Sequence, residues 1–529
     1  KVCFNYIKNS FNMKTRFIFG LLILASLELF GQSSDIKVIQ NQRVIGQNLV
    51  THQEIFAKQY QFPKEIYKKH LDSTSGNLTL QLRKLRKTAK VYAPQGQVVV
   101  FNLHSNTVNW SKKINYTIGT VEQYSNLITF SRENKIEYFN NATGMALWSD
   151  KNDLYYVDTD NNIGLQYIKN EKTNLQGINL NNGNSLWQRD ITRDYGWNKL
   201  LKMNDSTLLI AAGGLHSLNI KNGTGWDYNT VTGKKDYTET IAKNVVGVAL
   251  GVLTGTAVIS TGANLVRDVA SNVLIEGDYV YFASKEKVSK INKSNGDISW
   301  TYPLDEKTTS KSLLFKKDSL VFMINQGYAN FGNKKINFGD PFILALNTET
   351  GNQEFSRTVG TKDDFILDYK TGDDKLVLVL KDRILSLSLL NNTEIKEQTC
   401  NTSDFGELKF FAGSKIYKRD TSNLSNLVTS DSTKYFVQTN KGLTLALDND
   451  FKVSNQYNNN DLYYYYNATT DYNFFLKGDR DQTIISDKNN SIIAELKGTN
   501  FMFSFGDKLY CIDGKSLSII DINDIVVYN

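Results

Sequence analysis

The sequence predicts an all-β protein, a β-propeller of four-stranded blades, with eight blades favoured over seven. One hairpin pattern recurs, at first at intervals of 38 and 39 residues, and about forty residues is the length of one blade. The composition is rich in strand and turn residues, with 28 Tyr, 28 Phe and four Pro among 529 residues. Strand-like runs, such as those at 126–131 and 319–324, precede the hairpins.

Six segments carry the repeat, each with an asparagine, a turn residue four positions later and an aromatic residue at position eight, or seven for Trp226. The asparagine can bond its own backbone two residues on, and glycine supplies the positive φ of a tight turn. We expect the aromatic ring to be buried between neighbouring sheets. The asparagines are Asn102, Asn140, Asn179, Asn219, Asn292 and Asn347; the turn residues are Asn106, Gly144, Gly183, Gly223, Gly296 and Gly351; the aromatic residues are Trp110, Trp148, Trp187, Trp226, Trp300 and Phe355.

Weaker copies of the hairpin follow at 383–395, 442–451, 483–494 and 509–517. A ring of blades closes when strands from the two ends of the chain pair, whereas an open solenoid needs polar end caps. We expect the extended stretches at 35–45 and 517–528 to make that closure.

Residues 344–351 read Leu-Ala-Leu-Asn-Thr-Glu-Thr-Gly, and a phenylalanine follows at 355. This pattern resembles the repeat of the pyrroloquinoline-quinone (PQQ) propeller family, and the resemblance extends over residues 78–528, most clearly up to 355. The resemblance implies the fold and not the cofactor. The family includes quinone-dependent dehydrogenases, the outer-membrane assembly lipoprotein and chains without known activity, and we interpret this chain as a non-enzymatic member.

The N-terminal part reads as a targeting region followed by a lead-in. Residues 1–12 are interpreted as an upstream extension and 13–33 as a signal peptide, because a basic start, an apolar run and small residues follow one another. The signal resembles those of Bacteroidetes-type bacteria. Export would place the protein in the periplasm, at the outer membrane or outside the cell. In the lead-in at 34–77, a capping-box pattern at 51–54 predicts a short helix after a first strand.

An insertion at 232–270 lengthens one interval of the repeat to 74 residues, and its stretch 244–266 has no charged residue. Gly247, Gly251 and Gly255 lie four residues apart, which on a helix gives a smooth face for close approach. We expect a helical hairpin, either packed on the propeller rim or projecting into a membrane or a partner. The hypothesis is that this insertion is the docking element.

No residue pattern predicts catalysis, a cofactor or a metal. The three cysteines, Cys3, Cys400 and Cys511, are far apart, whereas the resemblance to quinoprotein dehydrogenases would imply adjacent cysteines, PQQ, calcium and an aromatic floor. Trp197 is the one tryptophan outside the repeat position. The four histidines have no second ligand at metal spacing. A formal net charge of +7 on a surface this large gives no reason to expect nucleic acid as a partner.

Three functions remain open from the sequence. The first is a non-catalytic cell-envelope scaffold that holds a protein partner, with membrane contact through 244–266 as an option. The second is an oxidoreductase that depends on PQQ and calcium. The third is an extracellular ligand- or glycan-binding module, suggested by four consecutive tyrosines at 463–466, whose rings must alternate between the two faces of a strand.

Overall fold

The structure is a computed structural model, and its described part consists of strands with a few helices of three or four residues. The all-β prediction is confirmed. The regions interpreted as extension and signal peptide lie outside the described residues. The structure describes residues 36–525 except 87, 89–90, 133–134, 236–244, 250–264, 332–333, 373, 390–394, 431–434 and 498–500.

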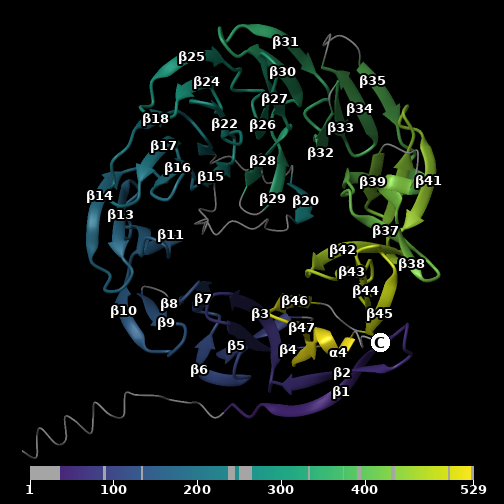
Figure 1. The fold of residues 1–529 in the computed structure, drawn as a ribbon. Helices are drawn as coiled ribbons and strands as arrows, with labels where there is room; N and C mark the ends of the chain where they lie inside the picture. The colour runs from purple at the N-terminus through teal and green to yellow at the C-terminus, as the bar shows by residue number, and fades with distance from the viewer. Residues whose placement is uncertain are drawn as a thin grey trace, which may run out of the picture. The chain divides into compact units, whose positions relative to one another are not determined.

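The chain divides into two units, and the first comprises residues up to Lys151 together with 480–485 and 493–529. It contains two separate four-stranded sheets, β3-β4-β5-β6 and β7-β8-β9-β10 (Figure 1). Seven further strands are neighbours in one sheet, in the order β44-β45-β1-β2-β48-β47-β46. A short helix, α4 (Ile522–Ile525), follows β48. The strands are β1 (Ile39–Asn48), β2 (Glu54–Gln61), β3 (Glu65–Asp72), β4 (Asn77–Arg86), β5 (Val91–Asn102), β6 (Thr107–Asn115), β7 (Gly119–Tyr124), β8 (Leu127–Arg132), β9 (Lys135–Asn140), β10 (Ala146–Asp150), β44 (Gln482–Ser486), β45 (Ile492–Lys497), β46 (Phe501–Phe505), β47 (Lys508–Asp513) and β48 (Ser516–Asp521).

The second unit comprises 152–479 and 486–492. Its described part has six four-stranded sheets and one five-stranded sheet, and four further strands are neighbours in the order β38-β37-β42-β43. Its elements are β11 (Asp153–Asp158), β12 (Ile163–Tyr167), β13 (Asn174–Asn179), β14 (Ser185–Asp190), β15 (Lys199–Lys202), β16 (Thr207–Ala211), β17 (Gly214–Asn219), β18 (Asp227–Asn229), β19 (Lys234–Lys235), β20 (Val245–Ala249), β21 (Leu265–Arg267), β22 (Leu274–Glu276), β23 (Tyr279–Ala283), β24 (Lys287–Asn292), β25 (Ile298–Pro303), β26 (Ser312–Lys317), β27 (Leu320–Asn325), β28 (Tyr328–Phe331), β29 (Lys334–Asn337), β30 (Phe342–Asn347), β31 (Gln353–Thr358), β32 (Asp368–Thr371), β33 (Lys375–Val379), β34 (Arg383–Ser388), β35 (Ile395–Thr399), α2 (Thr402–Phe405), β36 (Leu408–Phe411), β37 (Ile416–Asp420), β38 (Asn423–Asn426), α3 (Leu427–Ser430), β39 (Tyr435–Thr439), β40 (Leu443–Leu447), β41 (Val453–Asn458), η2 (Asn459–Asp461), β42 (Leu462–Ala468) and β43 (Asn473–Lys477).

Each four-stranded sheet is an antiparallel meander in chain order, interrupted in two sheets by an inserted hairpin. This is the construction of a propeller blade, so the predicted repeat unit is the one observed. The two middle strands are nearly continuous buried runs, as in β16 and β17, because both of their faces pack against neighbours. The described residues hold eight such sheets and further strands besides, and the number of blades in a closed ring stays a prediction.

Strands from the two ends of the chain pair within the first unit. β2 is antiparallel to β48, with Lys58 opposite Ile519. β1 lies between β2 and β45 and pairs with both. Gly46 is needed where β1 meets β45, because a Cβ there would lie 2.1 Å from a backbone oxygen of Glu495. The two stretches predicted to bring the ends together therefore lie in one sheet.

The helix predicted from the capping box at 51–54 is wrong. Those residues form a turn, and β2 begins at Glu54 with an alternating pattern of exposed and buried side chains. Ile55, Ala57 and Gln59 are buried on one face, so the two-residue period of a strand outweighs the local helix signal. The sequence pattern was misleading because a Thr followed three residues later by Glu is typical of a helix start but also occurs in turns.

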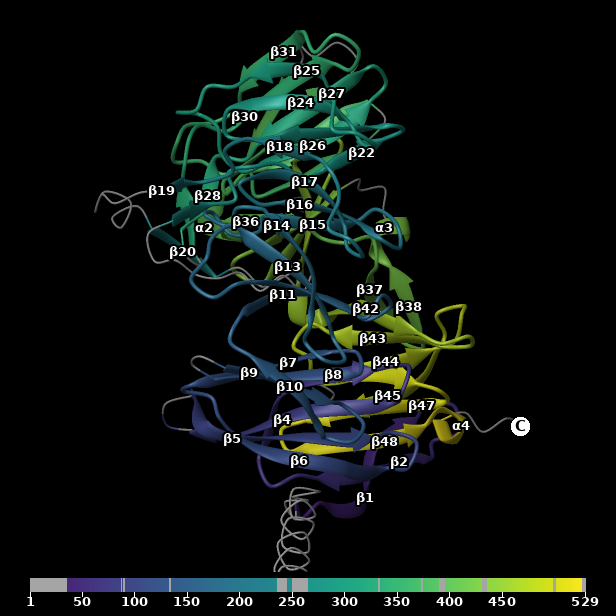
Figure 2. The same cartoon turned by 90° about the vertical axis from the view of Figure 1, so that its left-hand side faces the viewer.

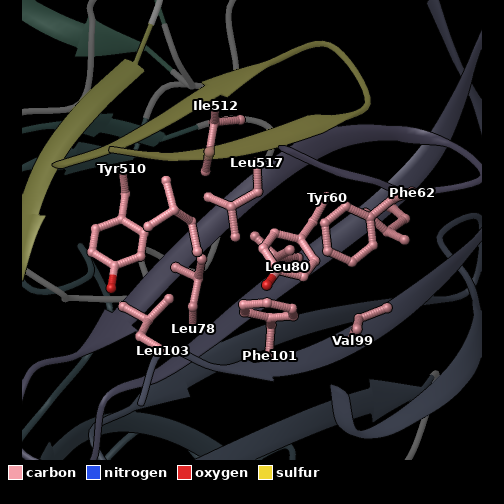
Figure 3. Packing of buried hydrophobic residues seen from close by; sticks show 12 residues of the cluster. Tyr60, Phe62, Leu78, Leu80, Val99, Phe101, Leu103, Tyr510, Ile512 and Leu517 are labelled. Carbon is pink, nitrogen blue, oxygen red and sulfur yellow. The ribbon is translucent and has the colours of Figure 1, made fainter. Parts of the chain in front are cut away.

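The first unit is held by a hydrophobic core that draws on both chain ends (Figure 3). Tyr60 from β2 lies 5.1 Å, centroid to centroid, from Phe101 of β5 in an edge-to-face arrangement, and Phe62 contacts the same ring. The core residues are Tyr60, Phe62, Leu78, Leu80, Leu82, Val99, Phe101, Leu103, Tyr510, Ile512, Leu517 and Ile519. Burial of this apolar surface makes the last strands as necessary to the unit as the first.

Four pairs of consecutive sheets are joined by one recurring interaction, which we call the indole–turn contact. Trp300 of β25 donates its indole N–H to the carbonyl of Thr348, at 3.0 Å, in the turn of the next sheet. Its ring lies over Gly351, where a Cβ would be 2.6 Å away. The same arrangement is made by Trp110 with Asn141 and Gly144, by Trp187 with Ile220 and Gly223, and by Trp226 with Lys293 and Gly296.

The turn in this contact is shaped by the repeat asparagine and glycine. Asn347 accepts hydrogen bonds from the backbone N–H groups of Glu349 and Thr350, and Gly351 has a φ of 74°. Glycine at this position thus meets two demands, a left-handed backbone and room for the indole ring. The asparagine bonds its own turn likewise in the other five repeats, with acceptors Asn102, Asn140, Asn179, Asn219 and Asn292.

One sheet replaces the indole by an ion pair. In β35 the register places Lys396 opposite Ser386, just as Phe355 is opposite Ala345 and Trp300 opposite Lys290. The Lys396 ammonium lies 3.8 Å from a carboxylate oxygen of Asp450, in the turn of the next sheet, and both side chains are more than half exposed. An exposed ion pair contributes little to stability, so this junction is held mainly by the buried core that the two sheets share.

We expect Trp300→Ala to lower the free energy of unfolding by about 3–5 kcal/mol, because it removes a large buried ring and one of the two donors to the Thr348 carbonyl, the other being the Lys290 ammonium. Lys396→Ala, at the corresponding position, should change it by less than about 1 kcal/mol. Urea denaturation followed by tryptophan fluorescence and circular dichroism measures both. Equal losses would show that the indole–turn contact is not what joins these sheets.

A second comparison isolates the glycine. Gly351→Ala and Gly277→Ala both put a side chain on a left-handed residue, with φ of 74° and 57°, at a cost of about 1 kcal/mol each. Gly277 has nothing within 4 Å of the added Cβ, whereas at Gly351 the Cβ meets the Trp300 ring. Gly351→Ala should therefore lose a further 1–3 kcal/mol, roughly, through overpacking. Thermal unfolding midpoints that fall equally in the two variants would contradict the contact.

Candidate functional site: an added sheet

Two insertions from different parts of the second unit build one sheet outside the repeat. Its order is β19-β21-β28-β29-β20, so the strands of the 232–270 insertion flank a hairpin that comes from between β27 and β30. Figure 2 shows β19, β20 and β28 grouped together. β21 pairs with β28 through Val266 opposite Phe331, and β20 pairs with β29 through Val245 opposite Ile336. We call this five-stranded structure the added sheet.

The prediction of a helical insertion is wrong for the part that the structure describes. Residues 234–235, 245–249 and 265–267 are strands, and Gly247 lies in β20. The described strand at 245–249 reads Val-Val-Gly-Val-Ala, whose β-branched residues favour a strand once a partner strand is present. Gly251 and Gly255 lie outside the described residues, so the small-residue face proposed for a helix stays untested there.

The β28–β29 hairpin was not predicted, although the sequence carries a sign of it. The interval between Trp300 and Phe355 is 55 residues, longer than the 38 or 39 of the regular repeats. The excess is the hairpin and its connections between β27 and β30. A long interval shows where extra residues lie, but it does not show that two insertions pair with each other, because that pairing depends on tertiary structure.

The base of the added sheet is held by Asp268, which directly follows β21. Its carboxylate accepts a hydrogen bond from the ammonium of Lys311 and, at 3.1 Å, one from the amide of Asn330. Asp268 itself has a φ of 64°, an uncommon value for a residue other than glycine. The three side chains connect the first insertion, the start of β26 and the second insertion, so the two insertions are fixed to the same point of the frame.

Behind this group the added sheet has its own small core. Val266, Val269, Ala329 and Ile336 are buried together, with Phe331 and Phe338 packed against them. Residues from both insertions contribute, so neither could bury its apolar face without the other. Where the structure describes it, the added sheet therefore has a hydrophobic core to which both insertions contribute.

A buried lysine lies beside the same group. Lys335 of β29 is 9% exposed, and its ammonium is 4.1 Å from the centroid of the Tyr328 ring. Burial, with a smaller contribution from the Lys311 ammonium, holds the pKa of Lys335 below its ordinary value, while Asp268 acts in the opposite direction. Burial raises the pKa of the Tyr328 hydroxyl. Two amide oxygens nearby, Oδ1 of Asn330 and of Asn337, are buried without a hydrogen-bond partner in the described structure.

The groups beside the added sheet are amides, a carboxylate and ammonium groups, all of which can form hydrogen bonds with a ligand. Within the described ranges, no three His, Cys, Asp or Glu side chains are placed to hold a metal ion. His216 is buried and bonded to Asp227 at 2.7 Å and to the Ala212 carbonyl, a position between strands of one sheet. No helix in the described part of the chain is long and apolar enough to cross a membrane.

The residues present do not fit a quinone site of the kind the repeat resemblance raises. Trp197, the one tryptophan left to floor such a site, is 2% exposed and donates its indole N–H to the Tyr167 hydroxyl at 3.0 Å. It packs in a core with Tyr155 and Ile191 and so has no free face for a ring to stack on. The two described cysteines, Cys400 and Cys511, are free thiols and are not neighbours.

The four consecutive tyrosines lie in β42. Tyr463 is buried, Tyr464 and Tyr465 are partly buried, and Tyr466 is 43% exposed. The Tyr465 ring has the Lys415 ammonium 3.8 Å from its centroid. Of the four rings, only that of Tyr466 is largely exposed. These residues therefore offer less surface for stacking than the sequence suggested.

Comparison with known proteins supports the repeat family over part of the chain. Residues 85–251 match the model of the family described as "Outer membrane protein assembly factor BamB". No curated protein matches. Among solved structures, BamB from Moraxella catarrhalis is 12% identical with a TM-score of 0.32, covering 78% of this chain and 98% of that one. The C-terminal WD40 domain of Sif2 is 9% identical, with a TM-score of 0.28 and coverage of 87% and 98%. Apo AztD from Citrobacter koseri is 10% identical with a TM-score of 0.29, covering 69% of this chain and 92% of that one.

The lowered pKa of Lys335 predicts how the added sheet responds to pH. The folded protein releases this proton at lower pH than the unfolded chain, so stability should rise as pH increases toward 10.5, the ordinary value. Lys335→Met removes this dependence. We expect the thermal midpoint of the native protein, relative to that of Lys335→Met, to rise as the pH is raised toward 10.5. Lys362→Met, at an exposed lysine, is the control; parallel curves for all three proteins would refute the buried ammonium.

Proposed function

We propose that this chain is a non-catalytic scaffold of the cell envelope that binds a protein partner through the added sheet. The observation that carries the proposal is the sheet itself: two insertions leave the repeat to build one ordered structure fixed at Asp268, Lys311 and Asn330. Loops and insertions on a rigid repeat frame are where binding function is usually found. The match of residues 85–251 to the BamB family supports an envelope location and a protein partner.

A strand edge is the part of the added sheet best suited to a partner. β20 is the last strand in the order, and in the described structure β29 is the strand with which it pairs. An unpaired edge offers backbone donors and acceptors to an extended segment of another protein, which can add to the sheet as a further strand. We therefore propose β20 as the contact strand, in place of a helical face at Gly247, Gly251 and Gly255.

The test removes β20 and keeps the base of the sheet. Lys235 of β19 is opposite Leu265 of β21, so residues 236–264 can be replaced by Asn-Gly, which closes the two strands with a two-residue hairpin turn. The partner should be lost from crosslinked complexes quantified by mass spectrometry, while the thermal midpoint is kept. Placing Asn-Gly at 421–422, the existing two-residue turn between β37 and β38, is the control.

If the 236–264 replacement folds and retains every crosslinked protein at the native level, the added sheet is not the docking element. The same experiment tests location, because the proteins recovered should be envelope proteins. A second candidate, the oxidoreductase that depends on PQQ and calcium, has no specific observation in its favour, since Trp197 is committed to a core.

A further inference from the structure

A polar hollow lies on one face of the β1-β2-β48-β47 strands of the first unit. Its volume is about 530 Å³, within the range of roughly 300–1,000 Å³ that small-molecule sites have. It is open to solvent, and ten residues line it: Gln40, Asn41, Gln42, Phe56, Lys58, Asn106, Lys508, Ile519, Asp521 and Asp524.

The strand register brings these side chains onto one surface. Gln42 of β1 is directly opposite Lys58 of β2, and Lys58 is opposite Ile519 of β48. Asp521 of β48 is opposite Lys508 of β47. Residues directly opposite in adjacent strands point to the same face, so the lining is a continuous patch built on four strands that come from both ends of the chain.

Phe56 gives the hollow an aromatic ring that the core does not use. It lies on β2 opposite Val44, and 46% of it is exposed. Ile55 and Ala57, on the other face of β2, are buried, whereas the core residue Tyr60 shares a face with Phe56. The hollow therefore lies on the same strand face as the core, at Phe56 and Lys58, where the side chains of β2 are exposed. A large exposed ring surrounded by polar groups is a surface on which the C–H groups of a ligand can pack.

The polar groups at the hollow keep donors and acceptors for a ligand, although Asp521 already accepts a hydrogen bond from the backbone N–H of Asn523. The amide side chains of Gln40, Asn41 and Gln42 have no hydrogen-bond partner among the described residues, and each amide offers both a donor and acceptors. Lys58, Lys508, Asp521 and Asp524 supply two charges of each sign and form no ion pair within the described structure. The balance of charge favours a neutral ligand that carries many hydroxyl groups.

Asn106 adds an unusual side chain to the lining of the hollow. Its Oδ1 is closed off from solvent and has no hydrogen-bond partner in the described structure, so the group that Asn106 can offer a ligand is its side-chain N–H donor. Asn106 also stands at the turn position where the other five repeats have glycine, and its φ is 56°. The repeat thus departs from glycine at the turn that lines the hollow, and the departure adds an amide there.

From these observations we propose that the hollow binds a neutral saccharide, with Phe56 packing against a sugar ring and Asn106, Gln40 and Gln42 bonding its hydroxyl groups. Sugars present just this combination of apolar C–H faces and hydroxyl groups that both donate and accept. The inference is independent of the scaffold function, because it concerns strands of the first unit and the partner site lies in the second.

Saturation-transfer difference NMR with cellotriose, maltotriose and N,N′-diacetylchitobiose as probes tests the proposal on the full chain. At least one probe should receive saturation from the protein, and its affinity should change little between about 50 and 500 mM NaCl because the ligand is neutral. Phe56→Ala should weaken binding roughly tenfold, the worth of one ring contact. Phe410→Ala, at another exposed phenylalanine, is the matched control.

Asn106→Gly is the sharper variant, because glycine keeps the positive φ and restores the residue of the other repeats while it removes the amide. It should fold as the native protein does and bind the probe more weakly, whereas Asn170→Gly, at an exposed asparagine with a φ of 68°, should bind normally. Three results would overturn the proposal: no probe binds, both phenylalanine variants bind alike, or Phe56→Ala instead dissociates a dimer in sedimentation, which would make this face an interface between copies.

Discussion

The indole–turn contact is the interaction on which the rest of the structure depends. A repeat sheet that is buried on both faces has no core of its own and is stable only against its neighbours, as in other stacked repeats. The contact joins sheets in two ways at once, with a hydrogen bond from the indole to a turn carbonyl and with the ring resting on a glycine that has no Cβ. The Trp of one repeat and the Gly of the next thus act together. Where Lys396 stands in place of the aromatic residue, an ion pair with Asp450 takes the place of the contact.

This frame explains where new structure can be added. The long intervals fall between Trp226 and Trp300 and between Trp300 and Phe355, while the spacing from asparagine to aromatic residue stays at seven or eight residues within each hairpin. Insertions therefore leave the indole–turn contacts of Trp226 and Trp300 in place. Because they emerge from successive repeats, they lie close enough to share the base at Asp268 and to bury one another's apolar side chains.

The sequence was informative wherever a pattern is local. The Asn, Gly and Trp positions predicted the hairpins, because turn geometry and a missing Cβ depend on neighbouring residues. The same approach failed at 51–54 and in the insertion, where a short helix signal competed with strand pairing to residues that are distant in the chain. Nor could it find the hollow: Phe56 and Lys508 are more than four hundred residues apart, and only the pairing of β2 with β48 relates them.

The pairing of β2 with β48 also has a consequence for the order in which the molecule is made. The core of the first unit needs Tyr60 and Leu517 together, so the N-terminal strands cannot complete their sheet until the last strand exists. At roughly 5–20 residues per second, synthesis separates them by something on the order of half a minute or more. The second unit can fold in that interval, while the earliest part of the chain waits with an open strand edge. The first residues to emerge are among the last to become native.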